Sequence, residues 1–349
     1  MKLRSGFVSI IGRPNAGKST LMNALVGEKV AIVTAKPQTT RTRINGILDV
    51  AAVKGKHPAA QIVFVDTPGV HKPASSLDKR MMQEVHDALE TRDAVLLIVD
   101  ATRRLELPED GTPEATEKRQ GKAESEDAFV FDMIRKLECP VFLLINKIDL
   151  IERAKLLPLI QRLSALHSFA EVIPISARKR DGLDRLLEAL IDVLPTGQRY
   201  FPKDQFTDQP ERFLVAELIR EKILTETGEE VPYASAVVIE RFEEPPPPDP
   251  KKKAKPGDKL PLTRIAAAIY CERQGQKAIL IGKGGAKLKA IGTAARKEIE
   301  SLLGTRVFLE LHVIVKDKWR ESPGFIESLD WRRQLEDIAA KESQSEDEE

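Results

Sequence analysis

The chain has 349 residues, of which 42% are hydrophobic and 31% are charged, and its formal net charge is +1. This length favours two domains over one, and the composition is ordinary for a globular protein. It argues against a disulfide scaffold, because the two cysteines lie far apart, and against a membrane-spanning protein, because every apolar run is too short. The N-terminus shows no secretory signal, so we expect a cytoplasmic protein.

From residue 6 to about 194, short aliphatic runs alternate with helical patterns. This alternation predicts an α/β domain over 1–194, with a mostly parallel sheet covered by helices. The predicted strands are Phe7–Ile11, Ile62–Val65, Val95–Val99, Val141–Ile145 and Val172–Ile175. The predicted helices are Ser19–Leu25, Asp78–Glu90, Phe129–Leu137, Ala154–Leu166 and Leu183–Leu194. Proline and glycine then predict a linker over 195–210.

A glycine-rich loop directly follows the first predicted strand and opens the first predicted helix. It reads GRPNAGKS over residues 12–19 and matches the P-loop pattern G-x-x-x-x-G-K-[ST]. Its backbone can fold around phosphates, Lys18 adds a positive charge at the β- and γ-phosphates, and the Ser19 hydroxyl can bind Mg²⁺. The predicted nucleotide contacts in this region are Gly12, Asn15, Ala16, Gly17, Lys18, Ser19 and Thr20.

The motif Asp66-Thr67-Pro68-Gly69 follows the strand predicted over 62–65. Its position predicts that Asp66 holds Mg²⁺ through water and that the Gly69 amide meets a γ-phosphate. Many small GTPases carry a glutamine directly after this motif to orient the attacking water, whereas this chain has Val70. Without an evident general base, we expect slow intrinsic hydrolysis. His71 is more typical of a loop histidine than of a catalytic one.

A third motif, Asn146-Lys147-Ile148-Asp149, follows the strand predicted over 141–145. The Asp149 carboxylate can accept hydrogen bonds from the two neighbouring donors of guanine, a pair that adenine lacks. Ser176 and Ala177 follow the next predicted strand and complete the base pocket. Because the carboxyl ends of parallel strands share one edge of a sheet, we expect the motifs to meet there, and to select GTP or GDP over adenine nucleotides.

A second pattern, over 211–325, predicts a smaller α+β domain. Helical spacing covers Arg212–Thr225 and Ala286–Leu303, and strand patterns cover Ala234–Arg241, Arg264–Arg273 and Arg306–Val315. The short apolar run at 277–282 is compatible with helix or strand. This order of elements resembles that of a type-2 KH domain.

The loop before the last of these helices has the G-x-x-G pattern with which KH domains clamp nucleic-acid phosphates. Between Arg264 and Arg320, twelve residues are Lys or Arg and only five are Asp or Glu, which suits a polyanion. We expect the preceding hairpin to supply an apolar groove for bases. The predicted RNA contacts are Ile281, Gly282, Lys283, Gly284, Gly285, Lys287 and Lys289.

Two alternatives remain open for this second domain. It could be purely structural or bind another RNA or a protein, or it could act on RNA as an enzyme. The second alternative lacks a catalytic constellation, since His312 is isolated on a strand pattern. Two charged stretches, 102–127 and 243–259, are predicted to be surface insertions, and 326–349 is predicted to be an acidic tail.

These motifs together, with Gln38-Thr39-Thr40-Arg41 and the stretch 277–297, resemble the Era family of GTPases over about residues 5–325. The resemblance implies that Thr40 reaches Mg²⁺ when GTP is bound, although Thr39 is an alternative. It implies that Asn15 holds a potassium ion at the phosphates. It also implies binding of the KH domain to the 3′ end of small-subunit ribosomal RNA, a role in assembly of the 30S subunit from its precursor particle, a monomeric state, and peripheral membrane contact.

Overall fold

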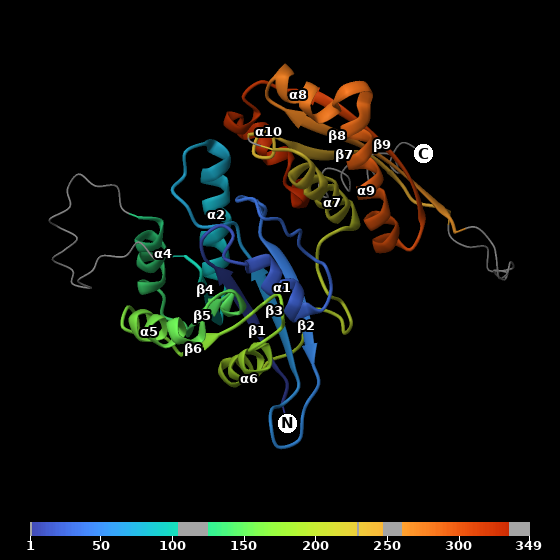
Figure 1. The fold of residues 1–349 in the computed structure, drawn as a ribbon. Coiled ribbons are helices and arrows are strands. Elements are labelled where there is room, and N and C mark those ends of the chain that lie inside the picture. Colours follow the sequence, from blue (N-terminus) through green and yellow to red (C-terminus); the bar gives the residue numbers. More distant parts are fainter. Residues whose placement is uncertain (1, 104–124, 229, 247–259, 335–349) are drawn as a thin grey trace, which may run out of the picture. The chain divides into compact units, whose positions relative to one another are not determined.

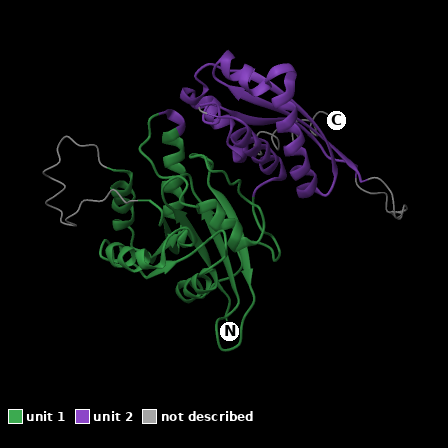
Figure 2. Ribbon diagram, in the orientation of Figure 1, with its two compact units in different colours: residues 1–74, 78–208 green, residues 75–77, 209–349 purple. Residues whose placement is uncertain are grey.

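The computed structural model describes residues 2–103, 125–228, 230–246 and 260–334. The chain divides into two compact units, shown in different colours in Figure 2. The first comprises residues 1–74 and 78–208, and the second comprises residues 75–77 and 209–349. Residues 104–124, 247–259 and 335–349, which include most of the two predicted insertions and of the tail, lie outside the described residues.

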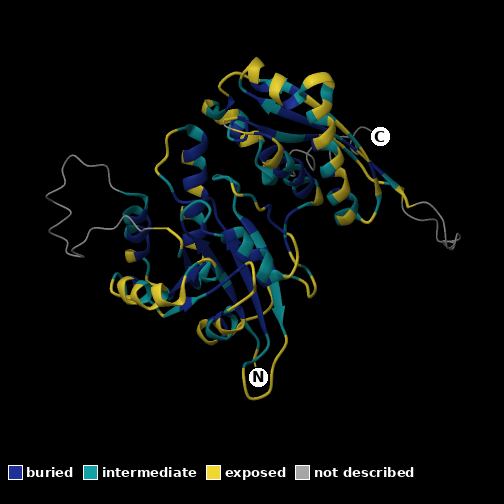
Figure 3. Cartoon of the chain, viewed as in Figure 1, coloured by how far each residue is buried: buried dark blue, intermediate teal, exposed yellow. Residues whose placement is uncertain are grey.

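The first unit is built on a six-stranded sheet with the order β2-β3-β1-β4-β5-β6 (Figure 1). Every neighbouring pair is parallel except β2 and β3, so the predicted mostly parallel sheet is confirmed. The strands are β1 (Arg4–Ile11), β2 (Ile44–Val50), β3 (Ala60–Asp66), β4 (Ala94–Asp100), β5 (Val141–Asn146) and β6 (Glu171–Pro174). Strands β3, β4 and β5 are buried along their whole length, and they are dark blue in Figure 3.

Helices surround this sheet, and most lie close to their predicted positions. They are α1 (Lys18–Val26), α2 (Ser76–Glu90), α4 (Glu126–Arg135), α5 (Arg153–Ser164) and α6 (Leu183–Val193), with a short 3-10 turn η1 (Ile148–Leu150). Helix α4 begins three residues before the predicted start, inside the expected insertion 102–127. The reason is local: the Ser125 hydroxyl accepts a hydrogen bond from the Ala128 amide at 3.2 Å and caps the helix.

Strand β2 was not predicted from the sequence. It carries Asn45 and Gly46 among its aliphatic residues, which weakens the alternating pattern. Gly46 is required by packing, because a Cβ there would lie 2.8 Å from the Val26 side chain. The strand pairs antiparallel to β3 at the edge of the sheet.

The expected linker is ordered against the first unit through residue 208, and we call residues 195–208 the strap. Its main anchor is the buried Gln61, which accepts hydrogen bonds from the Tyr200 and Phe201 amides at 2.8 and 3.1 Å. Further along, the Ile47 amide on β2 donates to the Phe206 carbonyl at 2.9 Å. The strap therefore extends the sheet at the β2 edge instead of spanning solvent.

The second unit has a three-stranded sheet with the order β7-β8-β9, in which β7 and β8 are antiparallel and β8 and β9 are parallel. The order of elements along the chain is α7 (Glu211–Glu226), β7 (Ala236–Glu243), β8 (Leu262–Cys271), α8 (Gln274–Ile281), α9 (Ala286–Leu303) and β9 (Arg306–Val315), followed by α10 (Pro323–Ser328). This is the α+β type-2 KH arrangement that the sequence predicts.

Helix α8 resolves the ambiguous apolar run at 277–282. The Gln276 side chain accepts hydrogen bonds from the Glu272 and Arg273 amides at 2.9 and 3.1 Å and completes a capping box. Gly282, with a φ of 71°, ends the helix. Leu280 faces the core of this unit, so the apolar run is the last part of a helix.

Candidate functional site

The P-loop connects β1 to α1 and holds an unusual backbone conformation. Gly12, Asn15 and Gly17 have φ values of 156°, 65° and 104°. A Cβ at Gly12 would lie 2.5 Å from the Ile98 carbonyl oxygen, and one at Gly17 would lie 2.3 Å from the Asn146 amide nitrogen. Both glycines are therefore required by the close approach of neighbouring strands as well as by backbone conformation.

The motif at the end of β5 fixes the P-loop from outside. The Asn146 side chain donates to the Ala16 carbonyl at 2.8 Å and accepts from the Ala177 amide at 3.0 Å. The Lys147 amine donates to the Asn15 carbonyl at 2.8 Å. Three motifs that are far apart in the sequence are thus joined by direct hydrogen bonds, as the sequence analysis expects of one site.

Asp100, at the end of β4, is a site residue that the sequence analysis missed. Its carboxylate accepts from the Lys147 amine at 2.6 Å and from the Thr102 hydroxyl at 2.7 Å. Burial opposes its ionisation, but these hydrogen bonds and the charge of Lys147 outweigh burial and lower its pKa. Its position after a buried strand, on the same edge as the other motifs, is the signal that could have found it.

The Asp149 carboxylate lies on η1, directly after β5. It accepts a hydrogen bond from the Ser176 hydroxyl at 2.7 Å, and the Lys179 amine lies 3.9 Å from its other oxygen. Ser176 therefore orients the carboxylate by its side chain, while the neighbouring Ala177 offers its amide to Asn146. This arrangement leaves a fixed acceptor at the place where the sequence predicts a guanine base.

Three oxygen-bearing side chains converge beside the P-loop. The Ser19 hydroxyl donates to the Asp66 carboxylate at 2.6 Å, the Thr40 hydroxyl donates to the same oxygen at 3.1 Å, and the two hydroxyls are 2.9 Å apart. The other Asp66 oxygen is buried and has no hydrogen-bond partner among the described residues. A set of hard oxygen donors around a buried carboxylate fits Mg²⁺.

Thr39, the alternative to Thr40, lies elsewhere. Its hydroxyl donates to the Lys36 carbonyl at 2.7 Å and lies 2.8 Å from the Thr34 hydroxyl. The structure therefore brings Thr40, and not Thr39, to the oxygen cluster of Ser19 and Asp66.

The Lys18 amine is buried beside these oxygens. It donates to the Gly12 and Arg13 carbonyls, each at 3.1 Å. Burial lowers the pKa of this amine, and the nearby Asp66 carboxylate partly offsets that effect, so that the pKa is about 8. The amine is therefore mainly protonated at neutral pH and can meet a phosphate as a cation. Burial also raises the pKa of Asp66, against the influence of Lys18 and the two hydroxyls. A divalent cation would favour its charged form.

Gly69 packs directly against the P-loop, since a Cβ there would lie 2.6 Å from the Pro14 side chain. The Val70 amide donates to the Gly12 carbonyl at 3.1 Å, and the Val70 side chain is fully buried. Val70 cannot orient water with its side chain. The two ring nitrogens of His71 lie 2.8 Å from the Gly69 carbonyl and 3.0 Å from the Asp78 carboxylate. His71 therefore connects this loop to helix α2, which agrees with a loop histidine in a structural role.

In the second unit, the G-x-x-G loop joins α8 to α9. Gly282, Gly284 and Gly285 all have positive φ, and Gly285 caps α9. A Cβ at Gly282 would lie 2.8 Å from the Lys287 Cβ, whereas none of the neighbouring atoms comes within 4 Å of a Cβ at Gly284 or Gly285. The turn is tight at its first glycine and open at its tip.

The predicted RNA contacts are unequally placed. Lys283 and Lys289 are exposed, whereas the amine of Lys287 donates to the Glu226 carbonyl at the end of α7, at 2.8 Å. Ile281, the last residue of α8, is half-buried against the core. His312, which the sequence leaves isolated, pairs with the Glu240 carboxylate at 3.1 Å and has no catalytic surroundings among the described residues.

A groove of about 410 Å³ runs beside this loop. It lies between α9 and the edge strand β9, and is lined by Gly285, Leu288, Lys289, Gly292, Thr293, Arg296, Val307, Phe308, Leu309 and Leu311. The expectation that the preceding hairpin forms the groove is wrong. Strand β8 pairs with β7 on one side and with β9 on the other. Strand β9, and not the β7–β8 hairpin, therefore forms the sheet edge beside α9.

Fold and site together define a class: a P-loop GTPase unit followed by a KH domain. The sequence model of the 50S ribosome-binding GTPase family matches residues 7–147, and that of the KH domain matches residues 230–320. GTPase Era from Heliobacterium modesticaldum is 44% identical over 96% of this chain and 99% of the relative. GTPase Era from Lacticaseibacillus paracasei is 46% identical over 93% and 96%. The chain belongs to the Era family and is a GTPase.

Two solved structures of Era are similar over nearly the whole chain. An Aquifex aeolicus Era variant bound to GDP and AlF4⁻ has a TM-score of 0.76 and 38% identity, covering 94% of this chain and 98% of that one. Era bound to MgGDPNP and nucleotides 1506–1542 of 16S ribosomal RNA also has a TM-score of 0.76 and 38% identity, covering 93% and 98%. Both confirm the predicted architecture.

The adjacent threonines provide a direct test of the oxygen cluster. We expect Thr40→Val to weaken Mg²⁺-dependent binding of a GTP analogue by at least about tenfold, because it removes one oxygen donor from the cluster. Thr39→Val, the matched control, is expected to change binding less than about threefold. The measurement is a Mg²⁺ titration with a fluorescent GTP analogue. Equal losses in both variants would contradict the assignment of Thr40.

Proposed function

We propose that this GTPase holds its nucleotide at the edge of the sheet where the motifs meet. The observation that carries the proposal is the Asn146 side chain, which joins the P-loop to the loop of Ala177 through two hydrogen bonds. The phosphate contacts are Gly12, Asn15, Ala16, Gly17, Lys18, Ser19 and Thr20, and the base contacts are Asn146, Lys147, Asp149, Ser176 and Ala177. Mg²⁺ is held by Ser19, Thr40 and Asp66.

Hydrolysis in this site depends on positioning and charge. The Lys18 amine and the Gly69 amide would stabilise the negative charge of the transferred phosphate, and Thr40 would complete the set of metal-binding oxygens. Mg²⁺ held by Ser19, Thr40 and Asp66 would neutralise part of the phosphate charge. Because Val70 is buried and carries no hydrogen-bonding group, the chain lacks a side chain at this position to orient water. Slow intrinsic hydrolysis follows.

The base pocket predicts a change of nucleotide preference in Asp149→Asn. The carboxylate accepts from two guanine donors, so its loss is expected to lower GDP affinity by roughly 10²-fold or more. Xanthine carries a carbonyl where guanine carries its exocyclic amine, so the asparagine amide is expected to improve binding of XDP. Isothermal titration calorimetry with GDP, XDP and ADP measures both effects. The exposed Asp192→Asn on α6 is the control, and wild type that binds GDP and ADP equally would refute the pocket.

We infer a further cation at Asn15 from the family resemblance. The Asn15 amide nitrogen donates to the Ala35 carbonyl at 2.8 Å, so the side chain is held against the segment that follows helix α1. Amide and carbonyl oxygens suit K⁺, whose charge would then lie where other GTPases receive an arginine.

This inference predicts faster GTP hydrolysis in KCl than in NaCl at equal ionic strength. We expect about a tenfold difference, well below the 10³–10⁵ that an arginine finger supplies. Asn15→Gly keeps the left-handed backbone and removes the amide, so it is expected to abolish the difference. Phosphate release measured in both salts tests the idea, and equal rates in the wild-type protein would rule it out.

We propose that the KH domain binds the 3′ region of small-subunit ribosomal RNA and that the protein assists assembly of the 30S subunit. Support comes from family membership, from the solved Era complex that contains 16S ribosomal RNA, and from the open, basic G-x-x-G loop beside the α9–β9 groove. The alternative is a KH domain that is structural or binds another RNA or a protein.

The open tip of the loop allows a clean test. Gly284→Asp is expected to lower affinity for a synthetic RNA of the 16S 3′ sequence at least about tenfold, because a carboxylate meets the phosphates. Gly284→Asn is the matched control, since asparagine accepts the same positive φ without adding charge. Fluorescence anisotropy measures RNA binding, and GDP affinity should stay unchanged. Equal RNA binding by both variants and wild type would favour the alternative.

The remaining family-based predictions are a monomer in the cytoplasm, association with the 30S precursor particle, and peripheral membrane contact. Among the helices of the described residues, none is both long and apolar enough to cross a bilayer.

A further inference from the structure

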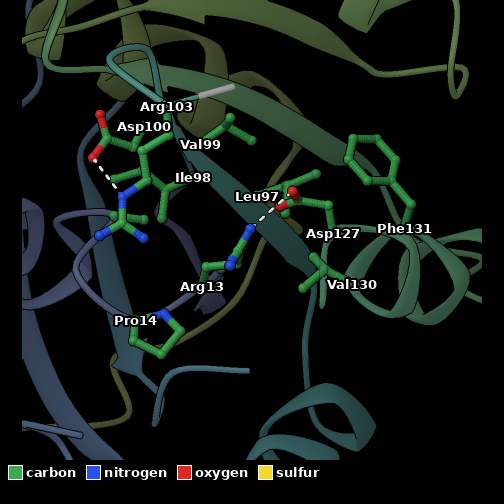
Figure 4. Close-up of a pocket in the computed structure, with 12 residues that line it drawn as sticks. Arg13, Pro14, Leu97, Ile98, Val99, Asp100, Arg103, Asp127, Val130 and Phe131 are labelled. Atoms are coloured by element: carbon green, nitrogen blue, oxygen red, sulfur yellow. Dashed lines mark hydrogen bonds and ion pairs between the residues drawn. The ribbon is translucent and has the colours of Figure 1, made fainter. Parts of the chain in front are cut away.

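Arg13, the second residue of the P-loop, points away from the nucleotide pocket. Figure 4 shows its side chain reaching across a second pocket, behind the P-loop, toward helix α4. Its two terminal nitrogens lie 2.9 Å from the Asp127 carboxylate and 2.7 Å from the Glu126 carboxylate. Both acidic residues lie in the first turn of α4.

This contact is built into the fold. Asp127 is only 3% exposed, and Val130 and Phe131 of α4 line the same pocket beside it. The Arg13 side chain is 26% exposed, so the ion pair is largely shielded from water. A carboxylate in such surroundings depends strongly on its cation, which distinguishes this pair from the exposed ion pair of Arg135 and Asp132 on α4.

The main chain of Arg13 belongs to the phosphate-binding machinery. Its carbonyl accepts from the Lys18 amine at 3.1 Å and from the Ala16 amide at 3.3 Å. The residue thus has its backbone inside the loop and its side chain fixed on a separate helix. A shift of the side chain would move the carbonyl that orients Lys18.

We propose that Arg13 and Asp127 are positioning residues for nucleotide binding, through which helix α4 holds the P-loop in its phosphate-binding shape. Other hydrogen bonds to the loop come from Asn146 and Lys147 of a nucleotide motif and from Val70, directly after another. The Asn15 side chain also donates to the carbonyl of the exposed Ala35, in the segment between α1 and β2. Arg13 adds an anchor from a helix that carries no nucleotide motif. The affinity of the site for its nucleotide consequently depends on the position of α4.

The experiment measures dissociation of fluorescent GDP and GTP together with steady-state hydrolysis. Arg13→Ala is expected to accelerate dissociation about tenfold, the cost of one charge-assisted hydrogen bond, and to raise KM while kcat changes less than about twofold. Arg13→Lys retains the positive charge, so its dissociation rate should stay close to that of the wild-type protein. Asp127→Asn should accelerate dissociation less, because Glu126 remains, and the double variant should be no faster than Arg13→Ala alone.

Arg135→Ala is the matched control, because Arg135 forms an exposed ion pair with Asp132 at 2.8 Å on the same helix and does not contact the P-loop. It should leave dissociation unchanged. The inference is overturned if folded Arg13→Ala and Asp127→Asn variants release GDP at the wild-type rate, or if their effects simply add. If Arg13→Ala does not fold, the nearly isosteric Asp127→Asn decides alone. The inference rests on the nucleotide site proposed above, and wild type that binds no GDP would reject that site instead.

Discussion

The backbone shape of the P-loop is the constraint on which the first unit depends. Three of its residues have positive φ, and two of these, Gly12 and Gly17, have neighbouring atoms where a side chain would begin. Such a conformation persists only if surrounding groups hold it. The Asn146 side chain does so by bonding the Ala16 carbonyl and the Ala177 amide at once. The loops proposed to bind the phosphates and the base are therefore joined through one side chain.

Charge inside the site is balanced around two buried groups. The Lys18 amine and the Asp66 carboxylate both lose hydration, and each shifts the other toward its charged form. Phosphates would add negative charge near Lys18, and a divalent cation would add positive charge near Asp66. The Thr40 hydroxyl donates a hydrogen bond to the Asp66 carboxylate and so favours its charged form. Thr40 lies in the segment before β2, the strand with which the strap pairs.

The motifs of the candidate site could be found in the sequence because each lies at the end of a strand, and parallel strands end at one edge. Local sequence patterns do not reveal contacts between residues that are far apart in the sequence. Strand β2 has its aliphatic pattern broken by Asn45 and Gly46, and it exists because β3 provides a partner. Arg13 and Asp127 are 114 residues apart, and their pairing requires the position of α4. The groove was assigned to the hairpin because strand order within a sheet is not encoded in local periodicity.

The two units use related backbone devices for different ligands. In each, a glycine with positive φ precedes the first helical residue: Gly17 before α1 and Gly285 before α9. Free amides at a helix start suit phosphate, which is the group proposed to bind at both loops. The surroundings differ, because Gly17 has the Asn146 side chain against it whereas Gly285 is open. An enclosed loop with anchors on several sides fits a compact ligand of fixed shape. An open loop beside the groove between α9 and β9 suits a single-stranded polymer, of which only a part lies at the loop.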